Sequence, residues 1–170
     1  LVTGAAGFIG SSMVDRLLTD NHTVVGVDNF STGQKPFIES ALKNPKYQFF
    51  EFDLLDKDKL VSSLREVDFV WHFAANADVR FGTEHPCRDL EQNTIVTSNV
   101  LEAMRQNKIY NIAFSSTGSI YGEANVIPTP EDCPMPVQTS LYGASKLACE
   151  GLISAYCEGF NMRAWIFRFV

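Results

Sequence analysis

The chain has 170 residues, of which 45% are hydrophobic, and this is enough for one domain with a sizeable core. Its formal net charge is -6 at pH 7 and it has no basic run, which excludes the usual nucleic-acid footprint of clustered Lys and Arg. No apolar stretch approaches the roughly 18 residues of a membrane helix and no signal-peptide pattern occurs, so we expect a cytoplasmic protein without membrane contacts.

Short β-branched or aromatic runs alternate with longer helical patterns along the chain. Strands are expected at 1–3, 23–28, 47–52, 67–73, 109–115 and 163–169, and helices near 8–20, 35–43, 56–64, 88–107 and 140–158. This order predicts an α/β fold, a Rossmann-type doubly wound parallel sheet with helices on both faces. Because a strand-like run stands at each end, we expect residues 1–170 to be one domain, truncated from a longer protein.

The segment 122–139 is predicted to be a loop, because its four prolines prevent helix or strand throughout: Pro128, Pro130, Pro134 and Pro136. A loop of this length is more often functional, for example as a lid, than a mere connection. The cysteines have neither C-x-x-C spacing nor a nearby His at metal-ligand spacing. We therefore expect no metal site and four reduced, buried thiols: Cys87, Cys133, Cys149 and Cys157.

The first predicted strand leads into a G-x-x-G-x-x-G sequence formed by Gly4, Gly7 and Gly10. Gly4 permits a tight turn, Gly7 lets backbone N–H groups approach a pyrophosphate, and Gly10 lets the next helix lie close to the sheet. The phosphates would sit at a helix N-terminus, where unpaired amides and the macrodipole favour negative charge. Glycines at this spacing also occur in plain turns, but the helical pattern that follows favours a dinucleotide cradle.

Two carboxylates follow the second and third predicted strands. Asp28 can accept hydrogen bonds from ribose hydroxyls and would repel a 2'-phosphate, which favours NAD over NADP; the alternative is a solvated turn acid before Asn29. Asp53 can accept from an adenine amino group, or it can cap the helix expected near Asp56. Both stand where ligands bind in open α/β sheets, beyond the carboxyl ends of the strands.

Tyr142 and Lys146 are four residues apart and therefore share one face of the predicted helix 140–158. That face continues through Cys149 and Ile153, so it is expected to face inward, where an ammonium group requires a partner. A lysine held near a phenol stabilises the phenolate and lowers its pKa, which makes the tyrosine usable as a general base. The alternative is an exposed tyrosine and a solvated lysine.

For some of the other polar residues the sequence leaves two alternative roles. Thr117 can hydrogen-bond the oxygen from which the tyrosine takes a proton, although this hydroxyl and its neighbours Ser115, Ser116 and Ser119 can also be turn-forming. Asn93 should face the sheet, where it either holds a backbone carbonyl or touches a cofactor. His72 is expected to be a satisfied core histidine, and His22 and His85 are expected to be exposed.

Five ordered motifs together resemble the extended short-chain dehydrogenase/reductase family of NAD-dependent epimerases and dehydratases: Thr3–Gly10, Asp28–Gly33, Phe73–Asn76, Phe114–Thr117 with Tyr121–Gly122, and Tyr142–Lys146. The resemblance spans the chain and is nearest to UDP-glucose 4-epimerases of the archaeal type. It implies a smaller C-terminal substrate domain that this chain lacks, so this fragment alone is not expected to turn over substrate.

The resemblance implies a catalytic set of hydroxyl, base and lysine at Thr117, Tyr142 and Lys146. It implies that NAD is bound by these residues: Gly4, Gly7, Phe8, Ile9, Gly10, Asp28, Asn29, Ser31, Thr32, Gly33, Asp53, Leu54, Phe73, Ala74, Ala75, Ala77, Asn93, Tyr142 and Lys146. Within this set, Phe8 and Ile9 would cover the pyrophosphate.

The implied reaction is a nucleotide-sugar 4-epimerisation, with UDP-glucose and UDP-galactose as the expected pair. Tyrosinate 142 would remove the sugar 4-hydroxyl proton while hydride passes to NAD; the 4-keto sugar would rotate and take the hydride back on its other face. Dehydratases of the family carry acids just after the Ser/Thr position, whereas Gly118 and Ser119 stand there in this chain.

The alternatives are a dehydratase or 4-keto reductase of the same family, and a non-catalytic NAD(H)-binding sensor or scaffold. The resemblance also implies a homodimer formed through helices 88–107 and 140–158.

Overall fold

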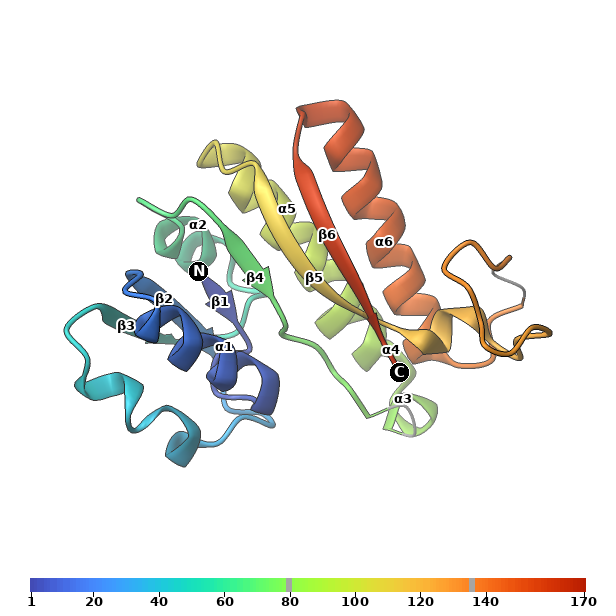
Figure 1. The fold of residues 1–170 in the computed structure, drawn as a ribbon, viewed down its shortest axis with the longest axis horizontal. Coiled ribbons are helices and arrows are strands. Elements are labelled where there is room, and N and C mark those ends of the chain that lie inside the picture. Colours follow the sequence, from blue (N-terminus) through green and yellow to red (C-terminus); the bar gives the residue numbers. More distant parts are fainter. Residues whose placement is uncertain (79–80, 135–136) are drawn as a thin grey trace.

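The computed structural model describes residues 1–78, 81–134 and 137–170, with the backbone alone at 81 and 82. Its centre is a parallel six-stranded sheet in the order β3-β2-β1-β4-β5-β6 (Figure 1). The strands are β1 (Val2–Thr3), β2 (Val24–Asp28), β3 (Tyr47–Glu51), β4 (Val70–His72), β5 (Asn111–Thr117) and β6 (Arg163–Phe169). The strand order reverses direction at β1 and β4, which confirms the doubly wound fold and places a ligand-binding crevice at their carboxyl ends.

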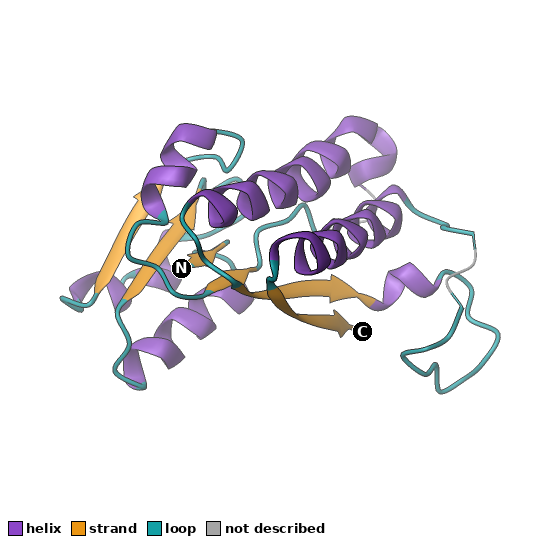
Figure 2. Ribbon diagram, turned by 90° about the horizontal axis from the view of Figure 1, so that it is seen from above, coloured by secondary structure: helices purple, strands orange, loops and turns teal. Residues whose placement is uncertain are grey.

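Helices lie on both faces of the sheet (Figure 2). The main helices are α1 (Phe8–Thr19), α2 (Lys57–Ser63), α5 (Val96–Gln106) and α6 (Leu141–Phe160), and two single turns, α3 (Phe81–Glu84) and α4 (Pro86–Asp89), precede α5. On one face α2 packs on α5 and α5 on α6, and their apolar side chains share one core with the sheet. On the other face α1 covers β1 and β2 through a smaller core that contains Val2, Val14 and Val24.

Two predicted helices differ from the structure. The helix expected at 35–43 is two short 3-10 helices, Lys35–Ile38 and Ala41–Lys43. Pro36 lies in the first turn of this segment, where a proline is tolerated, and Pro45 follows it. Because a proline disfavours the α conformation in the residue before it, Pro45 limits the segment at its end and leaves it too short for a stable α-helix. The helix expected at 88–107 begins at Pro86 and contains a π-helical segment, Leu90–Ile95, between α4 and α5.

Strand limits also shift by a few residues. β4 is shorter than the expected 67–73, and β5 runs to Thr117, so that Ser115 to Thr117 are the last residues of the strand and do not follow it. A 3-10 helix, Gly118–Tyr121, comes next. The loop at 122–139 has neither helix nor strand over its described residues; Pro136 lies outside the described residues.

The edge strand β6 alternates strictly between two environments. Ala164, Ile166 and Arg168 are partly buried, whereas Trp165, Phe167 and Phe169 are each nearly half exposed. The Trp165 ring contacts that of Phe69 in a tilted arrangement, with 5.5 Å between ring centroids. An aromatic stripe therefore lies along the face of the sheet opposite α5 and α6.

The four thiols are free, but only one of them meets the expectation of burial. Cys149 is buried inside α6, whereas Cys133 and Cys157 are partly exposed and Cys87 is exposed. In the described ranges, no helix combines the length and apolar character needed to cross a bilayer.

Candidate functional site

The glycine-rich turn after β1 has the backbone geometry that the motif predicts. Gly4 has φ +67°, a backbone conformation that residues other than glycine rarely adopt. A Cβ atom on Gly10 would overlap the carbonyl group of Gly4, so α1 can approach β1 this closely only with glycine there. The helix begins after Gly7 without a side-chain cap, which leaves its first amides available to an anion.

Asp28 joins the glycine-rich turn to the end of β2. One carboxylate oxygen accepts from the backbone N–H of Ala6 at 2.9 Å, and the other accepts from that of Phe30 at 2.8 Å. A Cβ atom on Gly33 would lie 2.7 Å from Asp28 Oδ1, so the following turn also closes on this carboxylate. The contact with Phe30, two residues on, is the one that a turn acid makes, whereas the bond from Ala6 ties Asp28 to the glycine-rich turn, which a solvated turn acid would not do.

Asp53 holds two amide side chains at the neighbouring end of the cradle. Its Oδ2 accepts from Asn29 Nδ2 at 3.0 Å and from Gln92 Nε2 at 3.2 Å. The helix-capping alternative for Asp53 is wrong, because Asp56 caps α2 by accepting from the backbone of Lys59. Gln92 is a site residue that the sequence analysis missed, since only the fold brings the π-helical segment beside the end of β3.

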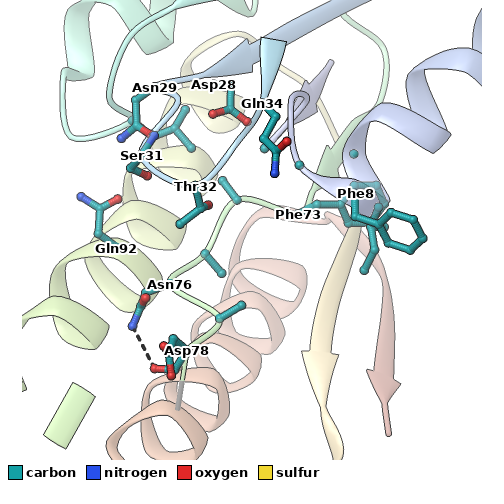
Figure 3. A pocket seen from close by; sticks show the side chains of 18 of the residues that line it. Phe8, Asp28, Asn29, Ser31, Thr32, Gln34, Phe73, Asn76, Asp78 and Gln92 are labelled. Atoms are coloured by element: carbon teal, nitrogen blue, oxygen red, sulfur yellow. Dashed lines mark hydrogen bonds between the residues drawn. The ribbon is translucent and has the colours of Figure 1, made fainter. Parts of the chain in front are cut away.

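These elements surround a pocket of about 710 Å³, a volume suited to a small molecule or cofactor (Figure 3). The predicted residues that line it are Gly4, Gly7, Phe8, Ile9, Gly10, Asp28, Asn29, Ser31, Thr32, Leu54, Phe73, Ala74, Ala75 and Ala77. Asn76, the last residue of the predicted motif Phe73–Asn76, also lines the pocket, and the lining residues that were not predicted are Gln34, Phe37, Phe52, Asp78, Arg88 and Gln92. Phe8 stands at the mouth with 79% of its surface exposed, so its ring is open to contact with a ligand in the pocket.

The remaining predicted residues do not line this pocket. Gly33, Asp53 and Asn93 lie behind its wall, where they hold lining residues in place. Thr117, Tyr142 and Lys146 belong to the carboxyl end of β5 and the start of α6, and they form a second group.

Asn93 is buried in the π-helical segment and connects the two groups. Its Oδ1 accepts from the backbone N–H of Asn76 at 2.8 Å, and its Nδ2 donates to Ser145 Oγ at 2.9 Å. The Ser145 hydroxyl in turn donates to the carbonyl of Tyr142 at 2.8 Å. The structure therefore supports the backbone-holding role of Asn93 and extends it, because one amide ties the loop after β4 to the first turn of α6.

Lys146 points inward and is 2% exposed, so the solvated-lysine alternative is wrong. Its ammonium group donates to the carbonyl of Ser115 at 2.8 Å and lies 4.6 Å from the centre of the Phe114 ring. Burial lowers the pKa of Lys146 to about 8, because the charged form has lost most of its hydration. The residue can therefore gain or lose a proton near neutral pH.

Tyr142 begins the same helix face and is partly buried beside Thr117. The expectation of a lowered phenol pKa is not met: burial raises the pKa of Tyr142, contact with the Thr117 side chain works in the other direction, and the charge of Asp89 adds to the rise. The ammonium of Lys146 is directed at the Ser115 carbonyl in this conformation. Tyr142 is consequently a protonated phenol at neutral pH until a positive charge approaches it.

Thr117 is the last residue of β5 and also caps the 3-10 helix that follows. Its hydroxyl oxygen accepts from the backbone N–H of Ser119 at 3.1 Å. Ser115 Oγ donates to the carbonyl of His72, and Ser116 Oγ donates to Glu150, so these two hydroxyls are occupied elsewhere. Among the four hydroxyls that sequence alone could not rank, Thr117 is the one beside the tyrosine.

His72 is a satisfied core histidine, as expected. Its Nδ1 lies 2.7 Å from Thr3 Oγ1 and its Nε2 lies 3.0 Å from Thr97 Oγ1. Thr3 Oγ1 already accepts from the amides of Phe73 and Ala74, so its proton goes to Nδ1 and Nε2 carries the ring proton. Burial lowers the pKa of His72 to about 3, which keeps the ring neutral; His22 and His85 are exposed.

Comparison with known proteins shows which family the chain belongs to. A profile of the NAD dependent epimerase/dehydratase family matches residues 1–170. The chain belongs to this family. It is 40% identical, over 99% of its length, to a putative UDP-glucose 4-epimerase of Methanocaldococcus jannaschii, of which it covers 54%.

Two solved members of the epimerase/dehydratase family match over 98% of the chain. The Thermus thermophilus UDP-glucose 4-epimerase complex with NAD has a TM-score of 0.88 and 36% identity, with 53% of that chain covered. The Thermotoga maritima UDP-glucose 4-epimerase with UDP-glucose has a TM-score of 0.91 and 33% identity, again with 53% covered. The chain thus spans about half the length of the relatives that it matches.

Proposed function

We propose that the intact protein is an NAD-dependent nucleotide-sugar 4-epimerase that interconverts UDP-glucose and UDP-galactose. The observation that carries the proposal is that this member of the epimerase/dehydratase family combines a pocket for a cofactor with a tyrosine, a lysine and a threonine near the end of β5. A pocket large enough for a cofactor opens at the glycine-rich turn, and at the end of β5 Tyr142 lies beside Thr117 while Lys146 of the same helix reaches the Ser115 carbonyl. Gly118 and Ser119, where the dehydratases carry acids, favour epimerisation over dehydration.

The cradle residues fit the cofactor by their chemistry. The uncapped start of α1 offers backbone amides to a pyrophosphate, and the remaining lone pairs of Asp28 can accept from ribose hydroxyls. A carboxylate at this position would repel the 2'-phosphate of NADP, so NAD is the expected cofactor. When bound, NAD supplies a hydride acceptor that carries a positive charge in its oxidised form.

The chain's own residues would handle the proton. We assign the phenol of Tyr142 to remove and return the sugar hydroxyl proton, with the Thr117 hydroxyl beside it to orient the same oxygen. A nearby positive charge lowers the pKa of a phenol. Lys146, with its pKa at about 8, can supply such a charge, provided that its ammonium group leaves the Ser115 carbonyl.

The test is to incubate the intact protein with NAD and UDP-galactose and to analyse the sugar nucleotide formed. Tyr142→Phe should reduce turnover by about 10²- to 10⁴-fold, because it removes the proton acceptor, while NAD binding persists. A parent protein that forms no UDP-glucose would contradict the proposal. In a second incubation with NAD(P)H and a 4-keto nucleotide sugar, stoichiometric consumption of NAD(P)H would instead indicate a 4-keto reductase. A biological output unchanged by Tyr142→Phe would indicate a sensor.

We also propose that the protein is a homodimer formed through residues 88–107 and 140–158. The exposed apolar or small residues on these helices are Leu90, Ile95, Leu141, Ala148, Gly151 and Ala155. A Cβ atom on Gly151 would meet no atom within 4 Å, so the surface is open there. Such a surface allows close helix packing. Light scattering on the parent and on Gly151→Arg tests this, because a bulky charge there should give monomers only if the helices form the interface.

A cytoplasmic location and a part in galactose metabolism stay predictions of the same proposal. Growth on galactose, compared between cells with and without the gene, tests the metabolic part. Fractionation of the same cells tests the location.

A further inference from the structure

A buried acid stands one helical turn after Lys146. Glu150 follows Lys146 by four residues on α6, so the inward face that begins at Tyr142 carries three functional side chains at successive turns. Glu150 is 6% exposed. A carboxylate this deeply buried requires a charged partner and hydrogen bonds.

The partner is Arg168 on the edge strand β6. The guanidinium group forms a two-point contact, with Nη2 at 2.8 Å from Glu150 Oε2 and Nε at 3.2 Å from Oε1. This fork geometry fixes distance as well as orientation, which a lysine could not do. The Ser116 hydroxyl also donates to Glu150 Oε1, so one carboxylate joins α6 to β5 and to β6.

The other side of the guanidinium reaches the segments that follow β5. Arg168 Nη1 donates to the hydroxyl of Tyr121 at 2.6 Å and to the carbonyl of Glu131 at 2.8 Å. The guanidinium carbon lies 5.2 Å from the centre of the Tyr121 ring. The same arginine therefore anchors the 3-10 helix after Thr117 and the proline-containing loop beyond it.

We infer that Glu150, held by Arg168 and Ser116, is a positioning residue for epimerisation, which sets the spacing between α6 and the end of β5. Ser116 stands between Ser115, whose carbonyl receives Lys146, and Thr117, whose hydroxyl stands beside Tyr142. A clamp on Ser116 thus fixes the strand residues that the tyrosine and the lysine of α6 must meet. The inference rests on the proposed function, because it concerns the geometry of that reaction.

Physical chemistry separates this role from simple stabilisation. The desolvation of two buried charges offsets most of their attraction, so neutral replacement of both partners is often harmless to stability, whereas loss of one partner is harmful. A pair that serves only stability should therefore be dispensable when both members are neutralised together. A pair that fixes the spacing of the catalytic residues should not be dispensable, because neutral replacement restores stability but not the spacing.

The experiment compares the intact parent with Glu150→Gln, Arg168→Met and the double variant. The melting temperature, the Kd of NAD, and kcat and KM for UDP-galactose are measured for each. Glu102→Gln is the matched control, because Glu102 forms a two-point contact with Arg105 on the solvent side of α5. This control should keep the parent's kcat.

We expect Glu150→Gln to lower kcat by about tenfold to a hundredfold, the effect of a misplacement of about 1 Å, with KM and the Kd of NAD within about twofold. The double variant should regain the melting temperature lost in Glu150→Gln, except for the share that the Arg168 contacts with Tyr121 and Glu131 supply, while its kcat stays low. Recovery of kcat together with the melting temperature would overturn the inference, as would an unchanged kcat in Glu150→Gln.

If Glu150→Gln does not fold, Ser116→Ala decides, because it keeps the ion pair and removes only the link to β5. A kcat several-fold below the parent supports the inference, and an unchanged kcat overturns it. The failure of the proposed function is seen separately, since a parent protein that does not convert UDP-galactose at all would refute that function and the positioning role with it.

Discussion

Lys146→Met should separate the stability of this fold from its chemistry. The pKa of Lys146 is about 8 in the folded protein against 10.5 for an ordinary lysine. At about 1.4 kcal/mol per pKa unit, holding the charged side chain in the core costs about 3 kcal/mol at pH 7. Methionine fills a similar volume without charge, but it removes the hydrogen bond to the buried Ser115 carbonyl, which costs about 1–3 kcal/mol. The variant should therefore be as stable as the parent, or up to about 2 kcal/mol more stable, at pH 7.

The sign of the pH dependence makes this prediction specific. Between pH 8 and 10.5 the unfolded chain retains the lysine proton that the folded protein has released, so the parent gains stability as the pH rises. Methionine does not titrate, and the advantage of the variant should shrink by about 2 kcal/mol between pH 7 and pH 10. Denaturant unfolding of both cofactor-free proteins at the two pH values measures it. A stability difference that does not change with pH would refute the assigned burial cost, whatever its size at pH 7.

Three further changes test other parts of the site. Gly10→Ala should abolish tight NAD binding, measured by fluorescence titration, because the new methyl group overlaps the backbone of the glycine-rich turn; an unchanged Kd would contradict this close approach. Asp28→Asn should cost about 1–2 kcal/mol of unfolding free energy, because its amide nitrogen can no longer accept from the Ala6 or Phe30 amide, and it should weaken NAD binding; equal values for both proteins would contradict the clamp. His72→Asn should reduce the loss of stability in acid. The His72 ring has a pKa of about 3 and stays neutral in the folded protein, whereas the unfolded chain takes up a proton below pH 6.5, so the parent loses stability as the pH falls. Unfolding curves between pH 6.5 and 4 should show that the variant lacks this one-proton dependence of the unfolding free energy.

The geometry of the glycine-rich turn and of Asp28 could be predicted from sequence because it depends on local structure. Gly4, Gly7 and Gly10 are demanded by one short turn and the helix that follows it, and Asp28 lies at the end of the next strand. Their roles depend on backbone conformation and on the carboxyl ends of adjacent parallel strands. The inward orientation of Lys146 was predictable for the same reason, since helix periodicity sets it.

Other parts of the site depend on contacts between distant segments. Gln92 reaches Asp53 across 39 positions of the chain, and its place in a π-helical segment has no simple sequence signal. The α-helix expected at 35–43 is two 3-10 helices, because hydrophobic periodicity alone does not register that Pro45 limits the segment at its end.

By itself the sequence determined the order of the strands and main helices, the glycine-rich turn after β1, and the identity of the threonine that ends β5 and of the tyrosine and lysine in α6. Only the tertiary structure decided the protonation of these groups. The pKa of Tyr142 is raised and that of Lys146 is lowered because each is buried among segments far away in the chain, and the lysine is directed at a backbone carbonyl. Backbone preferences act over a few residues and can be read along the chain, whereas desolvation depends on everything packed around a group in space.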